Sequence, residues 1–175
     1  RESTPVGLTP ASLLAKCAEN QVAGPVTVSV RNTRMGTPVK LRILVAQLNL
    51  LVGDIDGNRD KVIAATRAAR DRQAVDLLVF PELTLTGYPP EDLLLRPELT
   101  DRAADALTRI VSESRGIALV LGYPKVAMGG LFNVAGLVSD GQILGEYAKQ
   151  LLPNYSVFDE KRYFQPGNAP CVLDF

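Results

Sequence analysis

The chain has 175 residues, of which 46% are hydrophobic and 22% are charged, and its formal net charge is zero. This length allows one domain with a substantial core, and the charge balance does not indicate nucleic acid or an anionic membrane as a partner. The sequence contains no histidine and only two cysteines, Cys17 and Cys171. A Ser-His-Asp triad within the chain is therefore excluded, no metal site is indicated, and a cytoplasmic location is the default expectation.

Membrane insertion is not expected either, because no apolar run approaches the roughly 20 residues that a spanning helix needs. Residues 1–40 differ from the remainder, since no sustained hydrophobic period joins them to the rest of the chain. Leu8–Glu19 could form a helix and Thr27–Arg31 a strand. Met35 stands shortly before the first convincing strand. We therefore expect residues 1–40 to be an amino-terminal extension that contributes little to the core and could be disordered.

A strand-helix-strand unit occupies the next part of the chain. Leu41–Leu50 contains a run of apolar residues typical of a strand in the middle of a sheet. A turn-rich segment comes next, in which Asn58 is a suitable cap for a helix that continues to about Arg72. Val75–Phe80 is a second apolar strand, and Pro81 ends it because proline cannot donate to a sheet ladder. The unit predicts parallel pairing of its two strands.

The remaining regular part of the chain predicts hairpins. A helical turn at Glu91–Leu95 and a helix from Pro97 to about Ser114 come first. Strands then occur at short intervals, and Asp140-Gly141 is a strong hairpin signal between the last two. These strands are Ile117–Tyr123, Leu131–Val138 and Gln142–Ala148. Helical crossovers followed by hairpins predict an α/β fold with a mixed sheet.

The last residues, Cys171–Phe175, have the composition of a further strand, and we interpret Cys171 as a buried core cysteine. Because a domain does not normally end within a strand, the chain is expected to be truncated.

Three charged residues come after predicted strands or lie in the irregular segment behind them. Glu82 stands just beyond the carboxyl end of a buried strand, where open α/β sheets place their chemistry. Lys149 comes directly after the returning strand of the hairpin, and Glu160 lies in a charged segment shortly after it. Each one alone is explained most simply as a solvated surface charge. Tyr88 and Tyr155 alone could be aromatic residues at a rim.

Together these segments resemble the nitrilase superfamily, and within it the amino-terminal glutaminase domain of glutamine-dependent NAD synthetases. Phe80-Pro81-Glu82-Leu83 is similar to the glutamate motif of the superfamily, and Ala46–Ile55 resembles the start of the synthetase family. Two long motifs are more particular to the synthetases: Thr86–Leu94 (TGYPPEDLL) and Lys149–Phe164 (KQLLPNYSVFDEKRYF). The resemblance covers residues 41–175 and leaves residues 1–40 unmatched.

The resemblance implies a nitrilase-like α-β-β-α sandwich, of which residues 41–175 would supply the first half. It implies a Glu-Lys-Cys triad in which Glu82 is the base and Lys149 stabilises the oxyanion, while Glu160 supports the lysine and the substrate amide. Tyr88 and Tyr155 match positions that line the glutamine pocket. The implied partners are L-glutamine, a carboxyl-terminal synthetase domain and further copies of the protein. ATP and magnesium would serve that synthetase domain, and no cofactor is implied for this chain.

The chain departs from the family at the nucleophile, because neither Cys17 nor Cys171 matches its position. We therefore expect the 175 residues to be inactive alone, although the implied protein hydrolyses glutamine and supplies ammonia for ATP-dependent synthesis of NAD from deamido-NAD. Two alternatives remain open. The chain could belong to a stand-alone amidase, nitrilase or carbamoylase of the same superfamily, or it could be a non-catalytic fragment or interaction module that keeps the fold.

Overall fold

The structure, a computed structural model, describes residues 26–31 and 38–173. Within these ranges six strands form one sheet in the order β1-β2-β3-β4-β5-β6. They are β1 (Val26–Arg31), β2 (Pro38–Val45), β3 (Leu77–Val79), β4 (Ala118–Ala127), β5 (Gly130–Ser139) and β6 (Gln142–Ala148). β2, β3 and β4 are parallel, whereas β1 pairs antiparallel with β2, and β5 and β6 continue antiparallel from β4. The predicted mixed sheet is confirmed.

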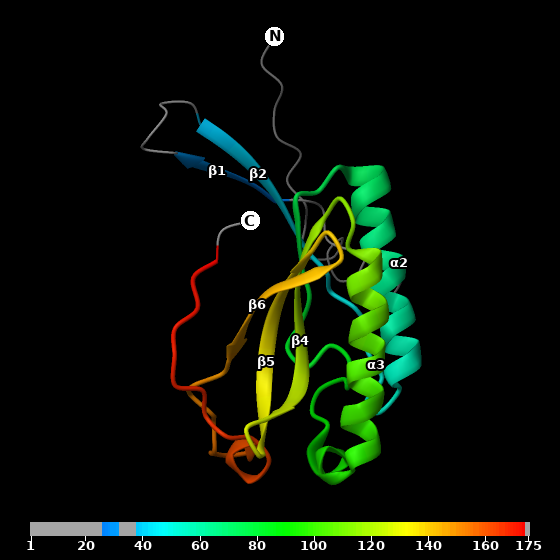
Figure 1. Ribbon diagram of the computed structural model, residues 1–175. Coiled ribbons are helices and arrows are strands. Elements are labelled where there is room, and N and C mark those ends of the chain that lie inside the picture. Colours follow the sequence, from blue (N-terminus) through cyan, green and yellow to red (C-terminus); the bar gives the residue numbers. More distant parts are fainter. Residues whose placement is uncertain (1–25, 32–37, 174–175) are drawn as a thin grey trace.

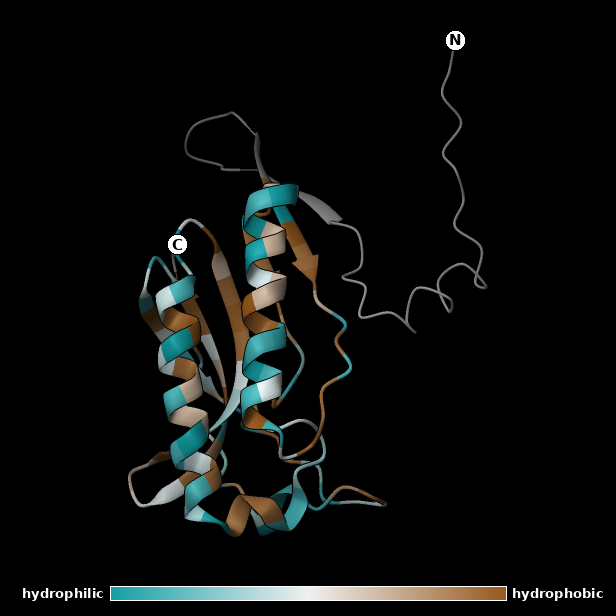
Figure 2. Cartoon of the chain, turned by 90° about the vertical axis from the view of Figure 1, so that its right-hand side faces the viewer, coloured by the Kyte–Doolittle hydropathy of each residue, from teal (hydrophilic) through white to brown (hydrophobic). Residues whose placement is uncertain are grey.

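Two long helices, α2 (Ile55–Gln73) and α3 (Pro97–Glu113), lie side by side on one face of this sheet (Figure 1). Figure 2 shows hydrophilic residues on the outer sides of both helices. Two short 3₁₀ helices, η1 (Glu91–Leu95) and η2 (Glu160–Arg162), complete the regular elements of the described chain. One helix layer and one sheet layer are thus present, which is the first half of the α-β-β-α sandwich that the sequence predicts.

The core fills the space between the two helices and the sheet. Each helix contributes apolar residues at the spacing of one helical face, and the central strands contribute a row of leucines that are fully buried. The helices supply Ile55, Val62, Ala65, Ala69, Leu99, Ala103, Ala106 and Ile110, and the strands supply Leu44, Leu78, Leu119 and Leu121. This packing fixes the carboxyl end of β3, after which the first residue of the candidate site lies.

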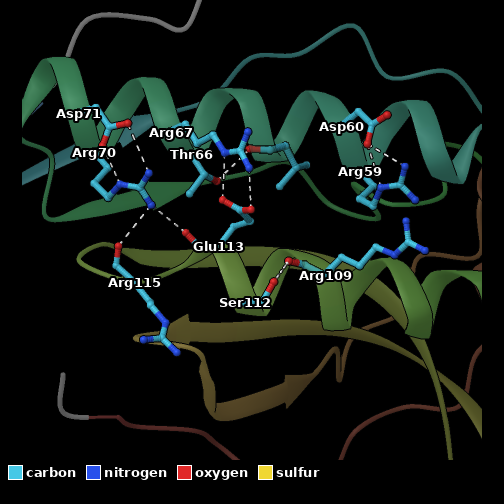
Figure 3. A network of polar contacts seen from close by, with 11 residues as sticks. Arg59, Asp60, Thr66, Arg67, Arg70, Asp71, Arg109, Ser112, Glu113 and Arg115 are labelled. Carbon is cyan, nitrogen blue, oxygen red and sulfur yellow. Dashed lines mark hydrogen bonds and ion pairs between the residues drawn. The ribbon is translucent and has the colours of Figure 1, made fainter.

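Polar contacts join α2 to α3 on the outer side of the core (Figure 3). The guanidinium group of Arg67 binds both carboxylate oxygens of Glu113, at 2.9 and 2.6 Å. Arg70 donates to the backbone carbonyl oxygens of Glu113 and Arg115 near the end of α3. Because these side chains are partly solvated, the contacts set the alignment of the helices more than they add to stability.

The start of α2 differs from the expectation that Asn58 caps it. The helix begins at Ile55, and its cap is Asp54, whose carboxylate accepts the N–H of Gly57 at 3.0 Å. Asn58 is instead fully buried, and its amide bonds the backbone of Leu51 and of Leu85. Its side chain therefore ties the segment before α2 to the segment after β3.

At both ends of the described chain the structure differs in part from the sequence analysis. The strand expected at Thr27–Arg31 is present as β1, and it adds an antiparallel edge to β2, a connection that the hydrophobic pattern did not reveal. The strand expected from Cys171 is absent from residues 171–173, and Cys171 is only partly buried, so its interpretation as a core residue was wrong. The helix expected at Leu8–Glu19 lies outside the described residues.

The observed ends of two strands also differ from the predicted ends. β2 ends at Val45 rather than Leu50, and β3 is limited to Leu77–Val79. The hairpin at Asp140-Gly141 is as predicted, with φ values of 48° and 81° at the two residues. The carbonyl of Ser114 accepts the N–H of Asp140 at 3.1 Å, so the end of α3 holds this turn. In residues 26–31 and 38–173, we find no helix with the length and apolar character needed to cross a membrane.

A buried phenol makes the sheet sensitive to alkaline pH. Tyr123 on β4 is buried, and its hydroxyl donates to Glu146 on β6 at 2.7 Å, while Lys125 pairs with the same carboxylate. Burial, and then the hydrogen bond to Glu146, raise the pKa of Tyr123 far above its usual value. Above about pH 10 the unfolded phenol loses its proton while the folded one keeps it, so stability falls as the pH rises.

We therefore expect Tyr123→Phe to lower the free energy of unfolding by about 1 kcal/mol at pH 8, through loss of the hydrogen bond. Above about pH 10 the wild-type protein should lose up to about 1.4 kcal/mol per pH unit that the variant does not lose. The difference between the two proteins should then shrink or reverse between pH 8 and pH 11. Urea unfolding at pH 8 and pH 11 measures the unfolding free energy of each protein. The same difference between the two proteins at both pH values would contradict the prediction.

Candidate active site

Glu82 lies in a tight turn directly after β3. Leu83 and Leu85 anchor this turn in the core, and the hydroxyl of Thr86 donates to the carbonyl of Leu83 at 3.2 Å. Leu83 has a φ of 47°, in the left-handed region that non-glycine residues rarely adopt. The turn points the Glu82 side chain out of the core, where it is 43% exposed. A carboxylate is thus held at the carboxyl end of a central parallel strand.

Lys149 reaches this carboxylate from β6, the edge strand of the described sheet, whose carboxyl end lies at the same end of the sheet as that of β3. It lies directly after β6, and its backbone N–H donates to the carbonyl of Asn133 on β5 at 2.8 Å. Its ammonium group lies 2.8 Å from Oε1 of Glu82, although the two residues are 67 positions apart in the sequence. The expectation that the two side chains converge is confirmed by this distance.

Glu160 contacts the same ammonium group from η2. Its two carboxylate oxygens each lie 2.9 Å from Nζ of Lys149. Only 8% of the Glu160 side chain is exposed, so the expected proximity and burial are both present. Its Oε2 atom accepts no hydrogen bond from the described residues.

The charge of Lys149 is well defined in this arrangement. Partial burial alone lowers the pKa of an ammonium group, but the hydrogen bonds and the negative charges of Glu82 and Glu160 outweigh burial and raise the pKa of Lys149. The lysine is therefore a fixed cation at neutral pH. A fixed cation can stabilise a negative charge that develops on a substrate oxygen.

Asn133 is a site residue that the sequence analysis missed. It is 4% exposed, and its Nδ2 atom donates to Oε1 of Glu82 at 2.6 Å. Asn133 interrupts the apolar strand sequence LFNVAGLV. A buried asparagine must find hydrogen-bond partners, so this position could have been recognised as a polar residue that points toward a site.

The two tyrosines lie in different hollows next to Lys149 and Glu160. Tyr88 lines a cavity of about 510 Å³ that also contains Glu160 and Phe158. Burial, followed by the charges of Glu160 and Glu82, raises the pKa of Tyr88, so its ring lies within electrostatic reach of both carboxylates. Tyr155 lines a separate hollow together with Lys149, and its ring packs edge-on against Phe158 at 5.6 Å. A smaller cavity of about 280 Å³ contains Glu82, Asn133 and Lys149.

No thiol lies among the described residues that surround Glu82 and Lys149. Cys171 lines another hollow, together with Lys125 and Glu146. Cys17 lies outside the described residues. The described part of the chain therefore contributes two carboxylates and a cation to the candidate site, and no thiol of the described residues lies there.

Comparison with known proteins identifies the family of the chain. The carbon-nitrogen hydrolase family profile matches residues 42–174, so the chain belongs to the carbon-nitrogen hydrolase family. It is 46% identical over 135 residues to a glutamine-dependent NAD(+) synthetase of Xylella fastidiosa, an alignment that covers 76% of this chain and 25% of that protein. The chain thus spans about a quarter of the length of this relative.

Solved structures of a synthetase and of an amidase are also similar to this chain. The structure of a glutamine-dependent NAD+ synthetase from Acinetobacter baumannii superposes with a TM-score of 0.72 at 43% identity and covers 76% of this chain and 25% of that chain. An amidase of the nitrilase superfamily from Nesterenkonia AN1 gives a TM-score of 0.67 at 31% identity, over 77% of this chain and 52% of the amidase. In another structure of that amidase, acrylamide has added to the active site cysteine.

Proposed function

We propose that residues 41–175 form the first part of a glutaminase domain in a glutamine-dependent NAD synthetase. The domain hydrolyses the side-chain amide of L-glutamine, and the released ammonia is used in the ATP-dependent conversion of deamido-NAD to NAD by a separate domain. The meeting of Glu82 and Lys149 at 2.8 Å beside buried Glu160 carries this proposal. The higher identity to a synthetase, 46% against 31% for the amidase, favours glutamine as the substrate.

In this proposal Glu82 takes the proton of a cysteine thiol that is supplied by sequence outside residues 1–175. A thiol with a pKa near about 8.5 is a poor nucleophile at neutral pH until a base removes its proton. The thiolate attacks the amide carbon, and Lys149 stabilises the oxyanion that forms. Glu82 gives the proton to the leaving nitrogen, ammonia departs from the tetrahedral intermediate and leaves a γ-glutamyl thioester, and water then hydrolyses the thioester to release glutamate.

In this scheme the neighbouring residues bind the substrate and orient Lys149. Glu160 holds the lysine in place as a cation, and its carboxylate also accepts a hydrogen bond from an N–H of the substrate amide. Tyr88 and Tyr155 flank the approach to Lys149 and form parts of the glutamine pocket. ATP and magnesium act in the synthetase domain, the glutaminase part needs no cofactor, and the whole protein works as a cytoplasmic homo-oligomer.

A second candidate is a stand-alone amidase, which the match to the Nesterenkonia enzyme favours. The two functions are separated by assaying the full-length protein with glutamine, ATP and deamido-NAD. We expect glutamate release coupled to NAD formation, and we expect Glu82→Gln to lower hydrolysis about 100-fold or more while synthesis from ammonium chloride continues. Hydrolysis of simple amides without NAD formation would support the amidase instead.

The same assay tests residues 1–175 alone, for which we expect no glutamate release because the described site lacks a thiol. Turnover that Cys171→Ala abolishes would identify Cys171 as the nucleophile. Turnover that is insensitive to Cys171 and to Glu82→Gln would overturn the proposed mechanism.

A further inference from the structure

Asn133 contacts both members of the Glu82–Lys149 pair. Its side-chain amide donates to Oε1 of Glu82 at 2.6 Å, and its backbone carbonyl accepts the N–H of Lys149 at 2.8 Å. One residue of β5 thus fixes the carboxylate that lies after β3 and the backbone that lies after β6. Because Asn133 is 4% exposed and lies within paired strands, it has little freedom to move.

The two oxygens of Glu82 are consequently not equivalent. Oε1 accepts hydrogen bonds from both Asn133 and Lys149, at 2.6 and 2.8 Å. Oε2 accepts none from the described residues. An oxygen that already accepts two charge-stabilising bonds is the weaker proton acceptor of the pair, because its lone pairs are engaged.

We propose that Asn133 is a positioning residue for the glutamine hydrolysis described above, and that it directs Oε2 of Glu82 toward the thiol. The proton of the cysteine Sγ–H passes to Oε2, which leaves a thiolate and a neutral carboxyl group. The thiolate sulfur then bonds to the amide carbon, and the carbon–nitrogen bond breaks as Oε2 gives the proton to the leaving nitrogen. Without the amide of Asn133, the carboxylate can rotate about its side-chain bonds and Oε2 loses this alignment.

Asn133→Ala in the full-length protein tests the inference. We expect the kcat of glutamine hydrolysis to fall roughly 10- to 100-fold, the effect of losing one charge-assisted hydrogen bond. KM should change less than about threefold, because Asn133 touches the base and not the substrate. Asn133→Asp keeps the shape of the side chain but places a second carboxylate next to that of Glu82. The loss of kcat should therefore be larger in Asn133→Asp than in Asn133→Ala. Asn168→Ala, which changes an exposed asparagine, serves as the matched control and should leave kcat unchanged.

The rate at which iodoacetamide alkylates the reactive cysteine is the second measurement, since it reports proton removal from the thiol without glutamine. We expect slower alkylation in both Asn133 variants, with unchanged circular dichroism. If the wild-type protein hydrolyses no glutamine but its thiol is alkylated more slowly in the variants, the proposed function fails and the role of Asn133 holds. Unchanged alkylation and kcat in folded Asn133→Ala, or a loss confined to KM, would overturn the inference.

Discussion

Replacing Lys149 by methionine is expected to lower the kcat of glutamine hydrolysis roughly 100- to 1,000-fold in the full-length protein, the range found when a single donor to an oxyanion is removed. Methionine preserves much of the length and apolar surface of lysine but not its charge. The oxyanion then forms near the carboxylate of Glu160, with no cation beside it. NAD formation from ammonium chloride should persist, because that reaction does not use this site.

The same substitution should also destabilise the glutaminase part, since it leaves the buried carboxylate of Glu160 without its partner. Removing one member of a largely buried ion pair costs roughly 1 to 3 kcal/mol when partial solvent access is allowed for. The double variant Lys149→Met/Glu160→Gln removes the unpaired charge and should recover much of this stability without recovering activity. That combination separates the catalytic role of the lysine from its role in the fold.

Both predictions are tested by measuring glutamate release and the melting temperature of the single and the double variant. Lys161→Met is the matched control, because Lys161 is an exposed lysine next to Glu160 in the sequence and contacts neither carboxylate of the site. It should change neither quantity. A Lys149→Met protein that keeps hydrolysis within about tenfold of the wild-type rate would rule out oxyanion stabilisation by this residue.

The regular elements of the domain were largely predictable from local signals. Pro97 marks the start of α3, Asp140-Gly141 gives the hairpin, and apolar runs predict the strands of both halves of the sheet. These signals are short-range, so a single segment contains all of the information. The cap of α2 was misplaced because Asp54 and Asn58 are both good capping residues, and only the burial of Asn58 distinguishes them.

The site itself was predictable only in part. Their spacing in the sequence did not predict that Glu82, Lys149 and Glu160 belong to one site. Only the family resemblance predicted it. Their convergence depends on the order of the strands, which places the end of β3 and the end of β6 on either side of β4 and β5. Asn133 was missed for the same reason, because the facing carboxylate lies 51 positions away in the sequence.

Gly122 is a second position at which strand order imposes a requirement on the site. A Cβ atom at this residue of β4 would lie 2.6 Å from the backbone nitrogen of Leu83, 2.8 Å from the carbonyl oxygen of Pro81 and 3.0 Å from Cα of Glu82. All three are backbone atoms of the turn that carries Glu82. The absence of a side chain at Gly122 therefore allows this turn to pack directly on β4.

Gly122→Ala should accordingly displace the turn and move the Glu82 carboxylate away from Lys149 and Asn133. A shift of the order of 1 Å at a reacting group can cost about 100-fold in rate, and overpacking of this kind typically costs about 1 to 3 kcal/mol of stability. We expect a loss of kcat roughly 10- to 100-fold together with a lower melting temperature.

Gly130→Ala on the adjoining strand β5 is the matched control, because the added Cβ would meet only the amide end of the Gln165 side chain, which can turn aside. It should leave kcat and melting temperature nearly unchanged. If Gly122→Ala and Gly130→Ala behaved alike, close packing of β4 against the Glu82 turn would not be what positions the base. A selective loss of hydrolysis in Gly122→Ala would show that the Glu82 carboxylate is placed by the contact of two backbones rather than by side-chain bonds alone.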